Sequence, residues 1–137
     1  MKVKNVFQTI TKSPDIIREN DSIQEVLLKI SIDLKTRSVF VVNEEEELVG
    51  IINVRDLLRV AGAKYLQRDT RMVIPYLTAN RAADIMQPPF FVSPEDEIDD
   101  ALRLAVTHDL KDIPVVEKGK IIGDLNCFEI LLNVNFE

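Results

Sequence analysis

Apolar and polar residues follow a pattern at 38–58 that predicts a β-hairpin running into a helix. The β-branched and aromatic run 39–42 predicts a strand, and four glutamates then form a polar turn. The apolar run 48–52 predicts the second strand. Asn53 stands where a helix N-cap is expected, with Asp56 in the first turn of the helix.

The same pattern returns at 112–132. Runs 113–116 and 121–125 predict the strands, a Lys-Gly pair predicts the turn, and Asn126 starts the helix. Both copies end in Gly-x-x-Asn-x-x-acid, where the acid of this second copy is Glu129. The chain therefore contains an internal repeat.

An amphipathic helix precedes each predicted hairpin, and a short proline-led strand, at 14–17 and 88–92, precedes each helix. Ser22-x-x-Glu25 fits a capping box at the start of the first helix. Helical spacing places one set of apolar residues on each helix face: Ile23, Val26, Leu27, Ile30 and Leu34, and in the second copy Ile98, Ala101, Leu102 and Ala105. Each repeat thus reads strand-helix-strand-strand-helix, an α/β fold of the α+β type.

The repeats are predicted to span 1–66 and 80–137, joined by a linker at 67–79 that contains Pro75. The last helix of the first repeat is expected from Val54 to about residue 65, past a glycine that weakens it. Either repeat alone is too short for a full hydrophobic core. Two copies that bury each other's apolar faces resolve this problem.

Composition narrows the function classes. The chain of 137 residues carries a net charge of −6 with no basic stripe, which argues against general nucleic-acid binding. It has no apolar run of the roughly 18 residues that a membrane span needs, and its start lacks signal-peptide features, so a cytoplasmic protein is expected. A single cysteine excludes an internal disulfide and a cysteine-based metal site. The four consecutive glutamates are typical of a solvated turn, and neither a metal nor a cofactor is expected.

Several spaced motifs resemble a tandem pair of CBS domains, a Bateman module. The strand Ile-Pro-Val-Val-Glu at 113–117 and the glycine-led run at 118–123 match that family, as does Asp84-Ile-Met86 ahead of the second repeat. In the first repeat, Val-Gly-Ile-Ile at 49–52 and Arg-Asp-Leu-Leu at 55–58 match equally well. The resemblance covers about residues 1–134.

The resemblance implies two repeats packed sheet to sheet with pseudo-two-fold symmetry and two clefts between them. It implies a regulatory module rather than an enzyme, a homodimer that binds an adenosine nucleotide or adenosyl compound such as AMP, ADP or ATP, and an unknown regulated protein. Four departures weaken this expectation. Asn53 and Asn126 replace the family's Ser or Thr, Phe40 replaces the strand proline, and Glu129 replaces the ribose-binding aspartate.

A carboxylate accepts hydrogen bonds from both hydroxyls of a ribose diol, and a helix N-terminus favours a phosphate. The predicted ribose and phosphate residues of the first repeat are Asn53, Arg55, Asp56, Lys12 and Arg37. By resemblance, the adenine residues are Ile16, Ile17, Ser38, Val39 and Phe40. A second, weaker site would use Phe90, Phe91, Asp112, Ile113, Pro114, Asn126 and Glu129.

Each candidate has a plain structural alternative. Both Asn-x-x-acid segments are also capping boxes that satisfy backbone donors at a helix start. Phe40 and Phe91 are candidates for purine stacking, but aromatic residues in strands more often pack in a core. A ligand-free structural or dimerisation module with degenerate sites therefore remains the alternative function.

Overall fold

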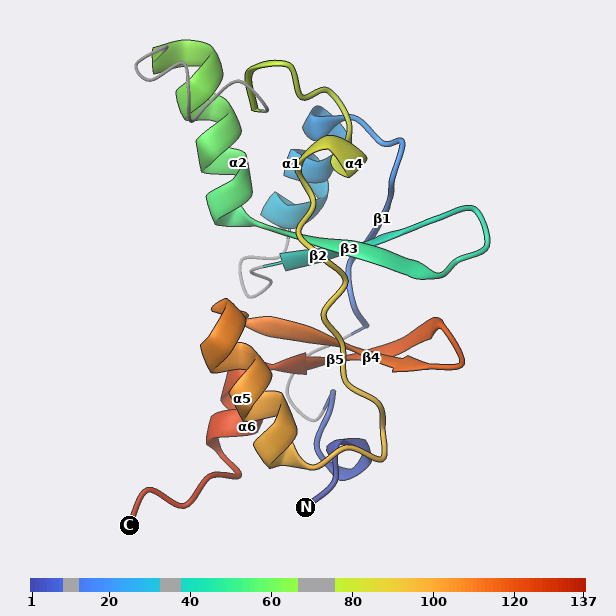
Figure 1. Ribbon diagram of the computed structural model, residues 1–137, viewed down its shortest axis with the longest axis vertical. Coiled ribbons are helices and arrows are strands. Elements are labelled where there is room, and N and C mark those ends of the chain that lie inside the picture. The colour runs from blue at the N-terminus through green and yellow to red at the C-terminus, as the bar shows by residue number, and fades with distance from the viewer. Residues whose placement is uncertain (9–12, 33–37, 67–75) are drawn as a thin grey trace. The chain divides into compact units, whose positions relative to one another are not determined.

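The computed structural model describes residues 1–8, 13–32, 38–66 and 76–137, and their contacts divide the chain into two compact units (Figure 1). The first-repeat unit comprises Asp15–Glu45 and Val49–Pro89. The second-repeat unit comprises Met1–Pro14, Glu46–Leu48 and Phe90–Glu137. The first residues of the chain thus pack with the second repeat. The repeat and linker limits read from the sequence stay a prediction.

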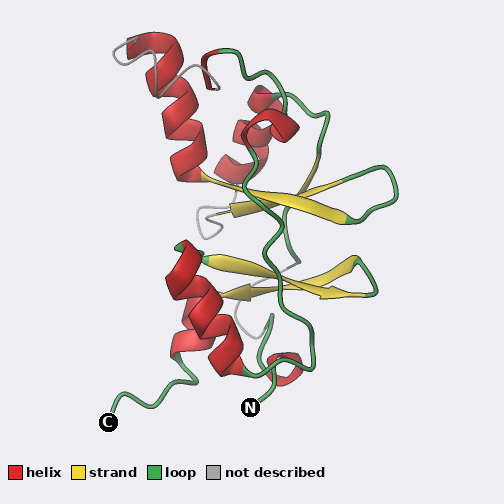
Figure 2. Ribbon diagram, viewed as in Figure 1, coloured by secondary structure: helices red, strands yellow, loops and turns green. Residues whose placement is uncertain are grey.

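The first-repeat unit carries a three-stranded sheet in the order β1-β2-β3, with α1, α2 and α4 on one face (Figures 1 and 2). Strands β1 and β2 are parallel, with Ile16 opposite Phe40. Its elements are β1 (Ile16–Arg18), α1 (Ile23–Ile32), β2 (Ser38–Val42), β3 (Leu48–Asn53), α2 (Val54–Ala61), η2 (Gly62–Leu66) and α4 (Ala82–Ile85). The predicted order strand-helix-strand-strand-helix is confirmed for this repeat.

Helix α1 packs on the core through only part of its predicted apolar face. Val26 and Ile30 are buried beside Val39 of β2, and the Ser22 hydroxyl accepts the Glu25 N–H at 3.1 Å, as the capping box predicts. The prediction for Leu27 is wrong, because 44% of this residue is exposed. Leu27 follows Val26 in the helix and so points about 100° away from the core-facing direction of Val26, which is buried. Leu34 lies outside the described residues.

The helix predicted from Val54 to about residue 65 continues past Gly62, as expected. Its hydrogen-bonding pattern changes there, since α2 ends at Ala61 and the five residues of η2 form a π-helix. Gly62 itself keeps right-handed helical angles (φ −59°, ψ −45°).

The second-repeat unit is built on the antiparallel hairpin β4–β5, with α5 and α6 on one side of it (Figure 1). Its elements are η1 (Val3–Asn5), α5 (Ile98–His108), β4 (Asp112–Glu117), β5 (Lys120–Asn126) and α6 (Cys127–Leu131). The strand predicted at 88–92 is reduced to one parallel bridge between Val92 and Val115. The two prolines at the start of that run have no N–H to donate to a ladder, which explains the loss.

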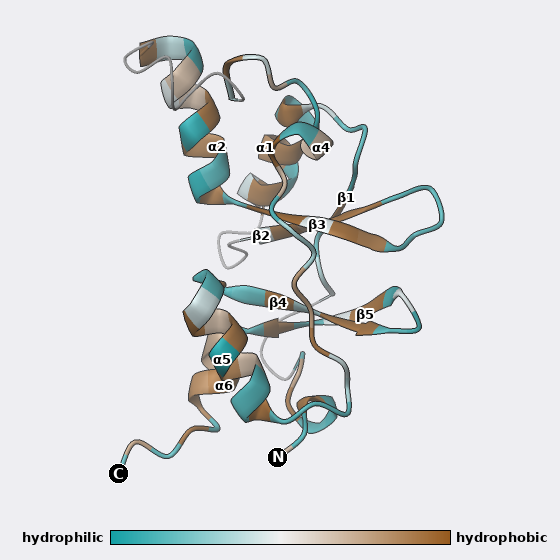
Figure 3. Cartoon of the chain, in the orientation of Figure 1, coloured by the Kyte–Doolittle hydropathy of each residue, from teal (hydrophilic) through white to brown (hydrophobic). Residues whose placement is uncertain are grey.

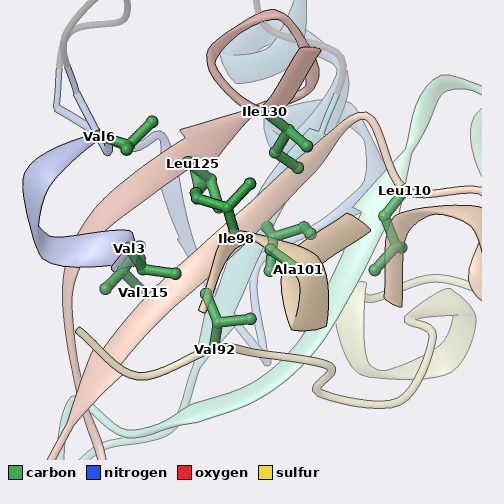
Figure 4. Packing of buried hydrophobic residues seen from close by; sticks show 10 residues of the cluster. Val3, Val6, Val92, Ile98, Ala101, Leu110, Val115, Leu125 and Ile130 are labelled. Atoms are coloured by element: carbon green, nitrogen blue, oxygen red, sulfur yellow. The ribbon is translucent and has the colours of Figure 1, made fainter. Parts of the chain in front are cut away.

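The N-terminal segment is part of the core of the second-repeat unit. Val3 and Val6 are 0% and 2% exposed and lie in one cluster with Ile98, Leu125 and Ile130 (Figure 4). Backbone hydrogen bonds fix it there, from Val3 N to Asp96 O at 2.8 Å, Lys4 N to Pro94 O at 2.9 Å and Ile98 N to Met1 O at 2.9 Å. A few residues at the start of the chain thus complete a core formed about 90 residues later.

The segment ahead of each repeat packs on the hairpin of the other repeat. Phe7 covers Gly123 of β5, where a Cβ would collide with its ring. Met86 covers Gly50 of β3 in the same way, with its Sδ only 2.5 Å from the place of a Cβ. These two glycines are therefore required by close contact rather than by backbone angles. We call 3–8 and 82–87 the first and second lead-in segments.

Hydropathy follows this architecture (Figure 3). The strands are rich in apolar residues, whereas the hairpin turn 44–47 is polar and exposed, as predicted. Among the described helices, none has both the length and the apolar character needed to cross a membrane. The predicted mixed α/β class with paired repeats is confirmed.

Candidate functional site

The start of α2 holds the first candidate site. Strand β3 runs directly into the helix, and Asn53 stays extended (φ −115°, ψ 174°), so its side chain turns back over the first turn. Asn53 Oδ1 accepts the Asp56 N–H at 3.1 Å, and Asp56 Oδ2 accepts the Asn53 N–H at 3.0 Å. This is the capping box that the sequence offered as the structural alternative. The Asp56 carboxylate is held in one orientation and is only 1% exposed.

Gln87 completes the surroundings of this carboxylate. Its side-chain Nε2 donates to Asp56 Oδ1 at 2.8 Å, so each carboxylate oxygen accepts a hydrogen bond from the protein. The Gln87 backbone is fixed against β3, with Gln87 N to Ile51 O at 2.7 Å and Ile51 N to Gln87 O at 3.1 Å. The sequence analysis missed Gln87. Its position directly after the Asp-Ile-Met motif of the second lead-in segment was the available signal.

The remaining residues predicted for the first site are partly brought together. The parallel register pairs Ile16 with Phe40 and Ile17 with Val41, which sets two of the predicted adenine residues side by side. Phe40 is 1% exposed and Ile16 is 36% exposed. The burial of Phe40 agrees with the core alternative given for it. Ile17 and Val39 are also buried and belong to the helix-facing core.

Polar members of that first set differ in placement. Ser38, at the start of β2, is 4% exposed. Arg55 is exposed on the first turn of α2. Lys12 and Arg37 lie outside the described residues, so the predicted phosphate-neutralising group stays a prediction.

The second candidate site, at the start of α6, is a buried hydrogen-bond network. Asn126 N donates to Glu129 Oε1 at 2.8 Å, and Asn126 Oδ1 accepts the Phe128 N–H at 2.9 Å. Asn126 Nδ2 donates to Asp112 Oδ1 at 2.9 Å, across the register that pairs these two residues in β4 and β5. Asp112, Asn126 and Glu129 are 1%, 4% and 0% exposed. The network satisfies a short helix start and leaves its carboxylates inside the protein.

The aromatic and apolar residues of the second site separate. The Phe90 ring stacks on His108, with 3.7 Å between ring centroids and 18° between planes. Phe91 is 53% exposed, so the preference for a core role is wrong for this residue. Ile113 is fully buried in the core, and the Pro114 carbonyl accepts the Val92 N–H at 3.1 Å.

The described residues offer little reactive chemistry. They contain no group of three or more His, Cys, Asp or Glu side chains that could hold a metal ion. Burial raises the pKa of the Cys127 thiol, which keeps this side chain protonated and weakly nucleophilic at neutral pH. The buried carboxylates near the helix starts are suited to accepting hydrogen bonds.

The two repeats of this mixed α/β fold each end in a hairpin followed by a helix with an asparagine N-cap and a capping-box acid. The model of the CBS domain family matches residues 3–63 and 82–133. The chain belongs to the CBS domain family.

Solved structures share this fold. A CBS domain-containing protein from Thermotoga maritima is 36% identical, with a TM-score of 0.85, and the match covers 96% of this chain and 92% of that one. The protein CBSX2 in complex with AMP is 23% identical, with a TM-score of 0.74 over 96% of this chain and 93% of that chain. The cytosolic domain of the Mg²⁺ channel MgtE in complex with ATP is 24% identical, with a TM-score of 0.70 over 97% of this chain and 48% of that chain.

Among curated proteins, an uncharacterised protein of Methanopyrus kandleri is 33% identical over 96 residues, or 69% of this chain. The uncharacterised protein YlbB of Bacillus subtilis is 26% identical over 114 residues, or 82% of this chain. The chain spans 44% and 70% of the lengths of these two relatives.

Proposed function

We propose that this chain is a regulatory module that binds an adenosine nucleotide or a related adenosyl compound, such as AMP, ADP or ATP. CBS domain pairs are typically regulatory, and two proteins that share this fold, CBSX2 and MgtE, were solved with AMP and ATP. The observation that carries the proposal is the oriented, buried Asp56 carboxylate at the start of α2. Its oxygens are the acceptors that a ribose diol needs.

The first repeat is the better of the two candidate sites. Aspartate keeps the length that the family uses for ribose, and Arg55 beside it contributes positive charge. At the second site the additional methylene of Glu129 moves the carboxylate, which accepts the Asn126 N–H. We therefore expect one good nucleotide site, with ligand affinity depending on Asp56.

Thermal-shift measurements with AMP, ADP, ATP, S-adenosylmethionine and NAD, followed by calorimetric titration of the best compound, test the proposal. Asp56→Ala is expected to lose about ten- to hundred-fold in affinity, corresponding to about 1.5–3 kcal/mol for a charge-assisted hydrogen bond. Glu129→Ala is the matched control, because it also removes an acid from a capping box. Equal, small losses in both variants would contradict the single-site proposal, and no binding by the wild type would contradict nucleotide sensing altogether.

A ligand-free structural or dimerisation module is the second candidate function. The specific observation in its favour is that both Asp56 oxygens already accept protein hydrogen bonds. Apolar side chains also remain exposed on the helices, among them Leu28, Leu58 and Phe128 at 55%, 67% and 63%. We expect a second copy of the chain to cover such residues, and sedimentation at micromolar concentration showing only monomer would contradict the homodimer.

The remaining parts of the proposal rest on the sequence and the family. The module is proposed to act on an unknown regulated protein and to have no catalytic activity and no cofactor of its own. Turnover of any nucleotide in the binding experiments would contradict the absence of catalysis. The cytoplasmic location stays a prediction.

A further inference from the structure

Gln87 donates a hydrogen bond to the Asp56 carboxylate, the acceptor that a ligand would use. The amide Nε2 lies 2.8 Å from Asp56 Oδ1, and the other oxygen, Oδ2, is taken by Asn53 N at 3.0 Å. Asp56 is 1% exposed with this amide in place. A carboxylate oxygen can accept a second hydrogen bond, but the burial of Asp56 leaves no open approach to Oδ1, so a ribose hydroxyl needs a covering side chain such as Gln87 to move.

Of the two groups that donate to the Asp56 carboxylate, the Gln87 side-chain amide is the one free to move. The Gln87 backbone is held on both sides by Ile51, at 2.7 Å and 3.1 Å, and the neighbouring Met86 is packed against Gly50. The Asn53 donor is a backbone N–H inside the capping box and cannot leave without opening the helix start. A glutamine side chain, in contrast, changes rotamer without disturbing the main chain.

We propose that Gln87 is a displaceable seal on the first-repeat site, whose amide competes with the ligand hydroxyl for Asp56 Oδ1. This inference rests on the proposed nucleotide-binding function and adds a regulatory residue to it. The apparent affinity of the site is lowered by the fraction of molecules in which the seal is closed. Ligand binding would also free the Gln87 side chain, and Gln87 lies two residues before Pro89, the last residue of the first-repeat unit.

The equivalent glutamine of the first lead-in segment makes a different contact. Gln8 N donates to Asp124 O at 3.2 Å, as Gln87 N does to Ile51 O. Within the described part of the chain, however, the buried Gln8 Oε1 has no hydrogen-bond partner. Gln8 thus shares the backbone position of Gln87, but the described residues include no hydrogen bond from its amide to a carboxylate. Gln8 is therefore a matched control.

The test is calorimetric titration of AMP into the wild type, Gln87→Ala and Gln8→Ala. The seal predicts that Gln87→Ala binds AMP about tenfold more tightly or better, because a charge-assisted hydrogen bond no longer competes. Gln8→Ala should bind within about twofold of the wild type, since its amide does not compete. Gln87→Met, which keeps the length of the side chain and removes the donor, provides the same comparison if the alanine variant is poorly folded.

Asp56→Ala separates competition from general loosening. In that background the Gln87 substitution should have no effect on AMP affinity, because the shared acceptor is gone. Unchanged or weaker AMP binding by Gln87→Ala, with a wild type that binds, overturns the seal and leaves the proposed function intact. If Gln87→Ala binds AMP and the wild type does not, the seal is supported, because Gln87 then keeps the wild-type site closed at the AMP concentrations used. If neither protein binds AMP, the proposed function fails for this nucleotide and the seal is overturned with it.

Discussion

Replacing Val3 with alanine tests the most unexpected feature of the fold, which is the place of the first lead-in segment in the core of the second-repeat unit. Val3 is 0% exposed and clusters with Val115 of β4 and Leu125 of β5. The substitution removes two buried methyl groups and changes no hydrogen bond, because the Val3 N–H remains available to Asp96 O.

The expected loss follows from the burial. Each buried methylene contributes about 0.8 kcal/mol, and the cavity that remains adds to the loss, so Val3→Ala should reduce the free energy of unfolding by about 2–3 kcal/mol. Urea denaturation measures this loss directly. Hydrogen exchange locates it, since amides of β4 and β5 should exchange faster while those of β1 and β2 in the first-repeat unit keep their protection.

Val106→Ala is the matched control. Val106 belongs to α5 of the same unit but is 75% exposed, so the same chemical change there should shift stability by less than about 0.5 kcal/mol. Faster exchange in β1 and β2 instead of β4 and β5 would refute the assignment of the N-terminal segment to the second-repeat unit. Equal stability of the Val3 and Val106 variants would refute the burial argument itself.

Two further predictions concern the second lead-in segment. Gly50→Ala places a Cβ 2.5 Å from Met86 Sδ and should destabilise the protein by about 1–3 kcal/mol in urea denaturation. Adding Met86→Ala should recover part of this loss, and no recovery would contradict the contact. The backbone N–H groups of Asn80 and Arg81 lower the pKa of Asp84 below its ordinary 3.8, so its stabilising effect is present above that pH and lost as the pH falls through the lowered value. The stability difference between wild type and Asp84→Asn should therefore shrink in acid, and a constant difference from pH 6 down to about 2 would contradict this linkage.

Local chemistry explains why much of the fold could be predicted from the sequence. The hairpins follow from β-branched runs separated by polar turns, and both helices after them begin at the predicted asparagines. Capping boxes span only four residues, so Asn53 with Asp56 and Asn126 with Glu129 carry their own signal. The repeat then predicted the paired architecture without any knowledge of distant contacts.

Non-local contacts explain the rest. The packing of Phe7 on Gly123 joins residues more than 100 positions apart, and no periodic pattern in the first eight residues predicts it. The hydrogen bond from Gln87 to Asp56 likewise connects residues 31 positions apart. The strand predicted at 88–92 failed for a local reason that the sequence did contain, because two adjacent prolines supply no N–H groups.

The two helix starts show how one repeat pattern can give two different sites. At the second, Asn126 links Asp112 and Glu129 within a single hairpin and helix. At the first, position 38 carries a serine where the second repeat has Asp112, and Asp56 Oδ1 instead accepts a hydrogen bond from the Gln87 side-chain amide of the second lead-in segment. Opening this buried network for a ligand would cost its members hydrogen-bond partners inside the protein. The Asp56 carboxylate, in contrast, can exchange the Gln87 amide for a ligand hydroxyl at little net loss of hydrogen bonds, which is why we propose the first repeat as the ligand site.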